Sequence, residues 1–208
     1  MEFAKEVSRR NLVDRVRNII AQPRSEWEVI AAEPATTQSL YRNYIMLLAA
    51  IGPVCSIVGN TLVGQTVPFF NIHYRVPLGS SIAYAVVDYV LTLAGVYVVA
   101  LIIDALAPTF GGVRDRTQAL KVSAYSMTPG WIIAVVALYP PLGILQLLGL
   151  YGLFLLYLGL PPVMKAPRER SVGYAVTTII AAIIVYIIIG AVAGMTISGP
   201  DFAATPPQ

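Results

Sequence analysis

The sequence predicts an all-α polytopic membrane protein with five transmembrane helices, preceded by amphipathic helices at the membrane interface. Three observations predict this fold class: the composition, five long apolar segments, and the positions of Lys and Arg. The chain has 208 residues, of which 57% are hydrophobic and 12% charged, whereas soluble domains are about a quarter charged. Because so little charge cannot cover a surface in water, we expect lipid to surround much of the chain.

Five segments are long and apolar enough to cross a bilayer, which requires about 20 apolar residues. They cover residues 40–63, 80–106, 122–139, 142–160 and 172–195. The third contains Pro129 and Gly130, so we expect an interruption there. The pair Pro140 and Pro141 cannot continue a helix, so it predicts a tight turn before the fourth span.

The basic residues predict the topology, because Lys and Arg near span ends stay on the cytoplasmic side. With five spans, 13 of the 14 Lys and Arg residues fall on one face, and only Arg75 falls on the other. We therefore expect a cytoplasmic N-terminus and an extracytoplasmic C-terminus. The chain then divides into an amphipathic cytoplasmic segment at 1–39, a membrane domain at 40–195, and a disordered extracytoplasmic tail at 196–208.

The segment before the first span predicts two short helices. It is too polar for a cleavable signal peptide. Its first apolar face consists of Leu12, Val13, Val16, Ile19 and Ile20, with Arg15 elsewhere. Ser25 and Glu28 predict a capping box that opens a second helix. We expect both helices to lie on the cytoplasmic leaflet, where Arg24 and Trp27 contact lipid or a partner. The alternative is a basic topology signal without another role.

Four stretches, in order, resemble one protein family. They are "IIAQPRSEWEVIAAE", "LAPTFGG", "QALKVSAYSMTPGW" and "LYGLFLLYLGLPPVMKAP". They stand in order between residues 19 and 167 and resemble the Yip-domain membrane proteins, which are named for interaction with Ypt/Rab GTPases. The resemblance is closer to the bacterial branch of that family.

The resemblance implies five spans, a cytoplasmic N-terminus and a place in the bacterial cytoplasmic (inner) membrane. It implies a non-enzymatic scaffold or adaptor for proteins or lipids and supplies no chemistry. The long cytosolic region that eukaryotic members carry before their first span is missing here. The resemblance therefore does not extend to GTPase binding.

Polar residues inside the spans suggest an alternative function, because ionisable groups in a membrane are costly and are functional candidates by default. Asp88 lies near the middle of the second span, and Tyr84 and Thr92 share its helix face. One interpretation is a proton or cation site in a small transporter or channel. The other is a neutral acid that joins two helices by hydrogen bonds, a role we also expect for Asn60. Asp104 is expected to pair with basic residues of the next loop.

Basic and glycine-rich stretches supply the remaining candidates. Arg114, Arg116 and Lys121 follow the second span and could attract anionic lipid headgroups. The neighbouring "FGGVRDR" lacks the phosphate-loop pattern, so we expect no nucleotide there. Gly190 and Gly194 form a G-x-x-x-G pair that permits close helix packing, within the bundle or in a homo-oligomer.

The sequence offers little for chemistry or metal binding. It contains one Cys and one His, which excludes an internal disulfide and an ordinary Cys/His metal cluster. We find no nucleophile with a matching base and no paired carboxylates at one depth. We therefore expect no enzyme activity, no cofactor and no nucleic acid partner, and instead lipids and a membrane or cytoplasmic protein as partners.

Overall fold

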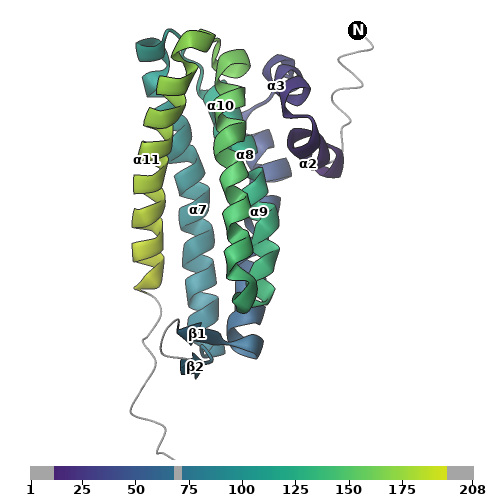
Figure 1. Ribbon diagram of the computed structural model, residues 1–208, viewed down its shortest axis with the longest axis vertical. Helices are drawn as coiled ribbons and strands as arrows, with labels where there is room; N and C mark the ends of the chain where they lie inside the picture. The colour runs from purple at the N-terminus through teal and green to yellow at the C-terminus, as the bar shows by residue number, and fades with distance from the viewer. Residues whose placement is uncertain (1–11, 68–71, 196–208) are drawn as a thin grey trace, which may run out of the picture.

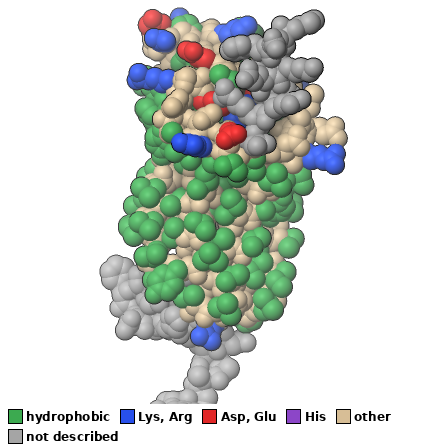
Figure 2. Space-filling model, turned by 90° about the vertical axis from the view of Figure 1, so that its right-hand side faces the viewer, with side chains coloured by type: hydrophobic (Ala, Val, Ile, Leu, Met, Phe, Trp, Pro, Cys, Tyr) green, Lys and Arg blue, Asp and Glu red, His purple; other side chains and the backbone are tan. Residues whose placement is uncertain are grey.

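The computed structural model describes residues 12–67 and 72–195 as a helical bundle (Figure 1). Five helical columns in this part of the chain are long and apolar enough to cross a membrane: Thr37–Val63, Leu78–Phe110, Arg116–Leu138, Pro141–Met164 and Arg168–Gly194. On the face that Figure 2 shows, apolar side chains cover the long middle of the molecule, whereas most of the charged side chains gather at one end. We call this end the basic end. The predicted five-span fold is confirmed, although the third span begins at Arg116 and not at residue 122.

The first span is assembled from short helical segments: α4 (Thr37–Leu40), η1 (Tyr41–Ile45), α5 (Met46–Ala49), α6 (Ile51–Val58) and η2 (Gly59–Val63). It opens with a reciprocal capping box. The backbone N–H of Ser39 donates to Thr36 Oγ1 at 3.1 Å, and that of Thr36 donates to Ser39 Oγ at 3.0 Å. The break at Ala50 follows from Pro53, which has no N–H to donate to the carbonyl of Ala49.

The connection to the second span contains a small sheet that the sequence did not predict. Strand β1 (Gln65–Val67) pairs antiparallel with β2 (Ile72–Tyr74), and Thr66 lies opposite His73. Each strand has three residues, which is too short for an alternating pattern to stand out. The chain continues into α7 (Leu78–Leu106) and the 3₁₀ turn η3 (Ala107–Phe110).

The third span is interrupted, and the chain turns before the fourth span, where the sequence predicted. The third contains α8 (Arg116–Ser126), α9 (Thr128–Ile133) and η4 (Ala134–Leu138), and the fourth contains η5 (Pro140–Leu150) and α10 (Tyr151–Met164). The helix breaks at Met127, because Pro129 cannot donate to the carbonyl of Tyr125. The turn between the two spans falls at Tyr139, directly before the Pro pair. The fifth span is the continuous helix α11 (Arg168–Gly194).

Helix α8 lies at the centre of the bundle and packs against α7 and α10. Its residues from Ala119 to Ser126 are all buried. Ser123 Oγ donates to the carbonyl oxygen of Val96 on α7 at 2.8 Å. Helix α11 packs on the other side of α7, so closely that a Cβ added to Gly95 would lie 2.5 Å from Ile189 Cδ1. The core therefore sits around α7, α8 and α10.

The two predicted N-terminal helices, α2 (Leu12–Ala21) and α3 (Pro23–Ala32), are present and lie beside the basic end (Figure 1). The predicted capping box at Ser25 is wrong. The helix begins at Pro23, whose fixed φ suits the first helical position, and Ser25 Oγ donates to the carbonyl of Gln22 at 3.1 Å. Residues 1–11 and the predicted tail at 196–208 lie outside the described residues.

Candidate functional site: the N-terminal hairpin and the basic end

Arg15 connects the two helices of the N-terminal hairpin to the bundle. Its Nη1 donates to Glu26 Oε1 at 2.6 Å, and its Nη2 donates to the carboxylate of Glu33. The guanidinium lies 5.7 Å from the centre of the Tyr125 ring on α8, a cation–π geometry. Arg15 is only 5% exposed, so this ion pair is shielded from water.

The position of Arg15 corrects the predicted apolar face of α2. Arg15 comes three residues after Leu12 and four before Ile19, so the three share one helix face. That face is turned toward the protein, whereas Val13 and Ile20 are exposed. The spacing was visible in the sequence, but a charged residue was not expected on the buried face.

Lys121 joins α8 to the C-terminal end of α3. Its Nζ donates to the carbonyl oxygens of Ile30 at 2.8 Å and Glu33 at 2.5 Å. Gln118 Nε2 donates to the carbonyl of Ala31 at 3.0 Å. Helix ends leave such carbonyls without intrahelical donors, so α8 supplies the cap that α3 lacks. Lys121 is consequently buried. The expected contact of Lys121 with lipid headgroups is therefore wrong.

Trp27 anchors α3 to the fourth span. Its side chain is fully buried, and its ring covers Gly159 so closely that a Cβ there would lie 2.7 Å away. The ring also meets Tyr125 edge-on, with 6.2 Å between centroids. The expected contact of Trp27 with lipid or a partner is therefore wrong. Gly159 leaves a recess on α10 that an indole fills, and this recess could not be read from the local sequence.

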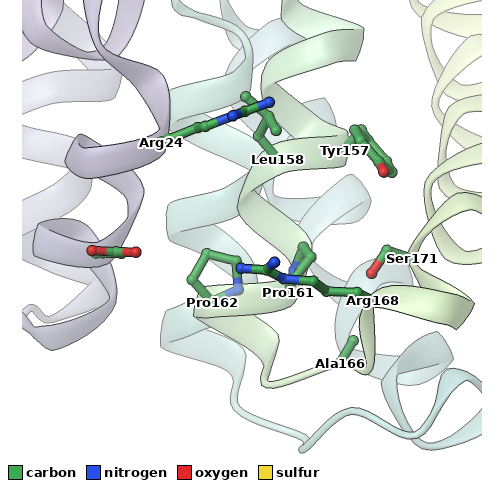
Figure 3. Close-up of a pocket in the computed structure, with 9 residues that line it drawn as sticks. Arg24, Tyr157, Leu158, Pro161, Pro162, Ala166, Arg168 and Ser171 are labelled. Carbon is green, nitrogen blue, oxygen red and sulfur yellow. The ribbon is translucent and has the colours of Figure 1, made fainter.

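A pocket of about 530 Å³ lies between α3, the end of α10 and the start of α11 (Figure 3). Arg24 and Arg168 line it from different helices, together with Glu28. Both arginines are exposed and make no ion pair with a described residue. The other residues that line the pocket are Tyr157, Leu158, Pro161, Pro162, Ala166 and Ser171. The predicted candidate Arg24 thus lies in a cavity, whereas Arg168 was not predicted as a site residue.

The other basic candidates lie near the glycine loop between the second and third spans. Arg114 and Arg116 are exposed, as a role toward headgroups requires. Gly111 ends η3 with a φ of 77°, a conformation that favours glycine. Gly112 approaches the end of α10, where a Cβ would lie 2.9 Å from the carbonyl oxygen of Met164. The backbone angle of Gly111 and the close approach of Gly112 explain the glycine pair without a ligand.

The intramembrane candidates do not form one cluster. Asp88 is half-buried on α7 and makes no hydrogen bond with a described residue. Tyr84, one helical turn before Asp88, is half-buried as well. Thr92 is also half-buried on α7. Asn60 lies apart from them. Its backbone carbonyl accepts a hydrogen bond from Val76 N at 3.2 Å. Val76 comes 12 residues before Asp88, a separation of about 18 Å at the rise of a helix.

Two further expectations have definite outcomes. The Oδ1 atom of Asp104 is buried without a hydrogen-bond partner among the described residues, so the expected pairing with basic residues of the next loop is wrong for this atom. A Cβ added to Gly190 or Gly194 would meet nothing within 4 Å. The prediction that this glycine pair packs closely within the bundle is therefore wrong. Its packing between two copies of the chain stays a prediction. No group of three or more His, Cys, Asp or Glu in the described ranges could hold a metal ion.

The fold and this site define a five-span integral membrane protein with a helical hairpin fixed to one end of its bundle. The sequence model of the Yip1 domain matches residues 17–190, and the chain belongs to that family. It is 28% identical over 177 residues to inner membrane protein YohC of Escherichia coli strain K12 and, equally, to that of E. coli O6:H1 strain CFT073. Each match covers 83% of this chain and 90% of the relative. No solved structure matches the chain significantly.

Proposed function

We propose that the protein is a non-enzymatic membrane scaffold or adaptor, which holds a protein or lipid partner against the hairpin and the basic end. The observation that carries this proposal is the difference between the two faces of the hairpin. Its inner face is fixed through Arg15 and Trp27, whereas Val13 on its outer face is 73% exposed and Ile20 is 37% exposed. A pre-ordered surface loses less conformational entropy on binding, which favours a partner there.

We place this surface on the cytoplasmic side of a bacterial inner membrane. The support is the asymmetry of Lys and Arg along the chain and the name of the E. coli relative, an inner membrane protein. A reporter fused after Gln208 should be extracytoplasmic, and one fused within "KAPRER" should be cytoplasmic. Finding both reporters on one side would overturn the orientation.

The scaffold proposal is tested by site-specific crosslinking in native membranes. A photoreactive residue in place of Val13 should yield a defined product with a partner. The product should disappear when Ile20 is replaced by Asp in a chain that still inserts. The control position is Leu147, which is 59% exposed on η5. Identical products from both positions would mean that the hairpin is not a specific surface.

A small transporter or channel is a second candidate, favoured by the absence of a hydrogen bond from Asp88 to any described residue. The position of the pocket between α3, α10 and α11 weighs against it, because Asp88 does not line this pocket. Replacing Asp88 with Asn keeps the shape and the hydrogen-bonding ability but removes the charge. The scaffold proposal predicts an Asn variant of unchanged thermal stability and no ion flux in wild-type proteoliposomes. A wild-type flux that is lost in a stable Asn variant would favour transport.

A further inference from the structure

We propose that the pocket between α3 and the α10–α11 turn binds one phospholipid, through its phosphate and through a hydrogen-bond donor in its headgroup. The proposal rests on the proposed scaffold function and deepens it by naming a class of lipid. The volume of about 530 Å³ lies within the range of small-ligand sites. The pocket is at the basic end, where the fourth span ends and the fifth begins.

The phosphate is bound by two arginines that approach from different helices. Arg24 lies level with Leu158, and Arg168 extends beside Pro161 and Pro162 (Figure 3). Guanidinium groups bind phosphate oxygens through paired, charge-assisted hydrogen bonds. Each arginine also lies in the first turn of its helix, since α3 begins at Pro23 and α11 at Arg168. The dipoles of both helices therefore favour an anion at this position.

The hydrogen-bond donor of the headgroup is bound by acceptors that line the same pocket. Pro161 and Pro162 lie inside α10 and have no N–H groups. The carbonyl oxygens of Tyr157 and Leu158, four residues earlier, therefore lack their usual helical donors. Both residues line the pocket, as does Glu28 with its carboxylate. A headgroup hydroxyl or ammonium satisfies these acceptors while the phosphate lies between the arginines.

The acyl chains lie against the apolar surface beside the pocket. Tyr157 lines the pocket and is 38% exposed. Phe154, about one turn earlier in α10, is 45% exposed. Val172, at the start of α11, is 58% exposed. A site with two arginines at its mouth and open apolar side chains below it fits an amphiphile. A soluble phosphate ester would use only its polar half.

The arginines are tested by titrating the purified full chain in neutral detergent with phosphatidylglycerol and counting bound lipid by native mass spectrometry. Arg24→Gln and Arg168→Gln should each weaken binding about tenfold, the effect of one lost charge-assisted hydrogen bond. Arg116→Gln removes the same charge from an exposed residue of the basic end that does not line the pocket. It should change binding less than about twofold. An equal loss in Arg116→Gln would show diffuse attraction and overturn the proposal.

The headgroup is tested by comparing lipids. Phosphatidylglycerol and phosphatidylethanolamine should bind about fivefold more tightly than phosphatidylcholine, whose headgroup has no donor. Glu28→Gln should weaken the binding of phosphatidylethanolamine, whose ammonium group loses a charged acceptor, more than the binding of phosphatidylglycerol, whose hydroxyl groups can use the carbonyls. Equal binding of all three lipids would overturn the role of the donor. Glycerol 3-phosphate that binds as tightly as the lipids would overturn the lipid assignment.

The same variants separate this proposal from the scaffold function. All three arginines are exposed, so their replacement should leave the thermal stability in detergent unchanged, which is measured alongside. If the Val13 crosslink is absent while lipid binding depends on Arg24 and Arg168, only the protein-partner function is overturned. If the crosslink forms but lipid binding ignores both arginines, only the pocket assignment is overturned.

Discussion

The third and fifth spans are both long apolar segments, yet they occupy opposite environments. In the most apolar 18-residue stretch of each, 61% of the third span is buried but only 22% of the fifth. Helix α8 buries even Lys121 and Ser123, whereas α11 exposes Val172 and Ile180. When lipid is the solvent, the helix with polar side chains moves to the centre, because only protein can satisfy them there.

The comparison also explains why the N-terminal hairpin is part of the fold. The polar groups of α8 at the basic end face α2 and α3, where Lys121 meets the carbonyls of Ile30 and Glu33. Tyr125 is covered by Arg15 and Trp27. The hairpin therefore completes the polar part of the core, and α11 has no comparable cover among the described residues.

The largest expected effect comes from removing Arg15. Arg15→Ala removes the buried guanidinium that pairs with both Glu26 and Glu33, and breaking a buried ion pair costs about 3–5 kcal/mol. We expect hydrogen exchange to increase across α2 and α3 but not in α11. Arg17→Ala, at an exposed position on the same helix, should stay within about 0.5 kcal/mol. Unchanged exchange in the Arg15 variant would show that the hairpin does not depend on this ion pair.

A pair of Gly→Ala substitutions compares the inner and outer surfaces directly. Gly159→Ala places a Cβ 2.7 Å from the Trp27 ring, and overpacking of this kind costs about 1–3 kcal/mol. Gly190→Ala on α11 meets open space and should not destabilise the protein. The measurement is the midpoint of thermal unfolding in detergent. Similar losses in both variants would contradict the contrast between these surfaces.

A smaller effect is expected from a buried hydrogen bond to the third span. The Tyr44 hydroxyl lies 2.6 Å from Thr128 Oγ1. Hydrogen bonds between membrane helices are worth about 0.6 kcal/mol on average and reach about 1.7. Tyr44→Phe should therefore lower the free energy of unfolding within that range. Tyr97→Phe is the control, because Tyr97 is 38% exposed, and a loss of the same size there would remove the assigned role of this bond.

The smallest effect is expected on the outer face of α11. Ile180 is 56% exposed, so Ile180→Leu exchanges one lipid-facing apolar side chain for another. The free energy of unfolding should change by less than about 0.5 kcal/mol. A loss above about 1 kcal/mol would indicate that a second copy covers this face. Crosslinking between copies, in the wild type and in this variant, would then identify the interface.

The sequence by itself determined the number of spans, the interruption of the third span and the turn before the fourth. Bilayer thickness fixes the length of each apolar segment. Pro129 and Pro140 have no N–H to donate, and the helix breaks or turns beside each of them. Both effects are local, so a single sequence is enough to read them. The family resemblance depends on the order of such local stretches, and the match of the Yip1 domain to residues 17–190 confirmed it.

Only the tertiary structure decided which way the N-terminal residues face. Apolar periodicity indicates that a helix has two faces, but it does not say whether lipid or protein covers one of them. Lys121 lies 91 residues from its acceptor Ile30, and Trp27 lies on Gly159 in the fourth span. Arg15 can be buried because Glu26 and Glu33 neutralise its charge. These arrangements, and the pocket between Arg24 and Arg168, exist only where distant segments meet.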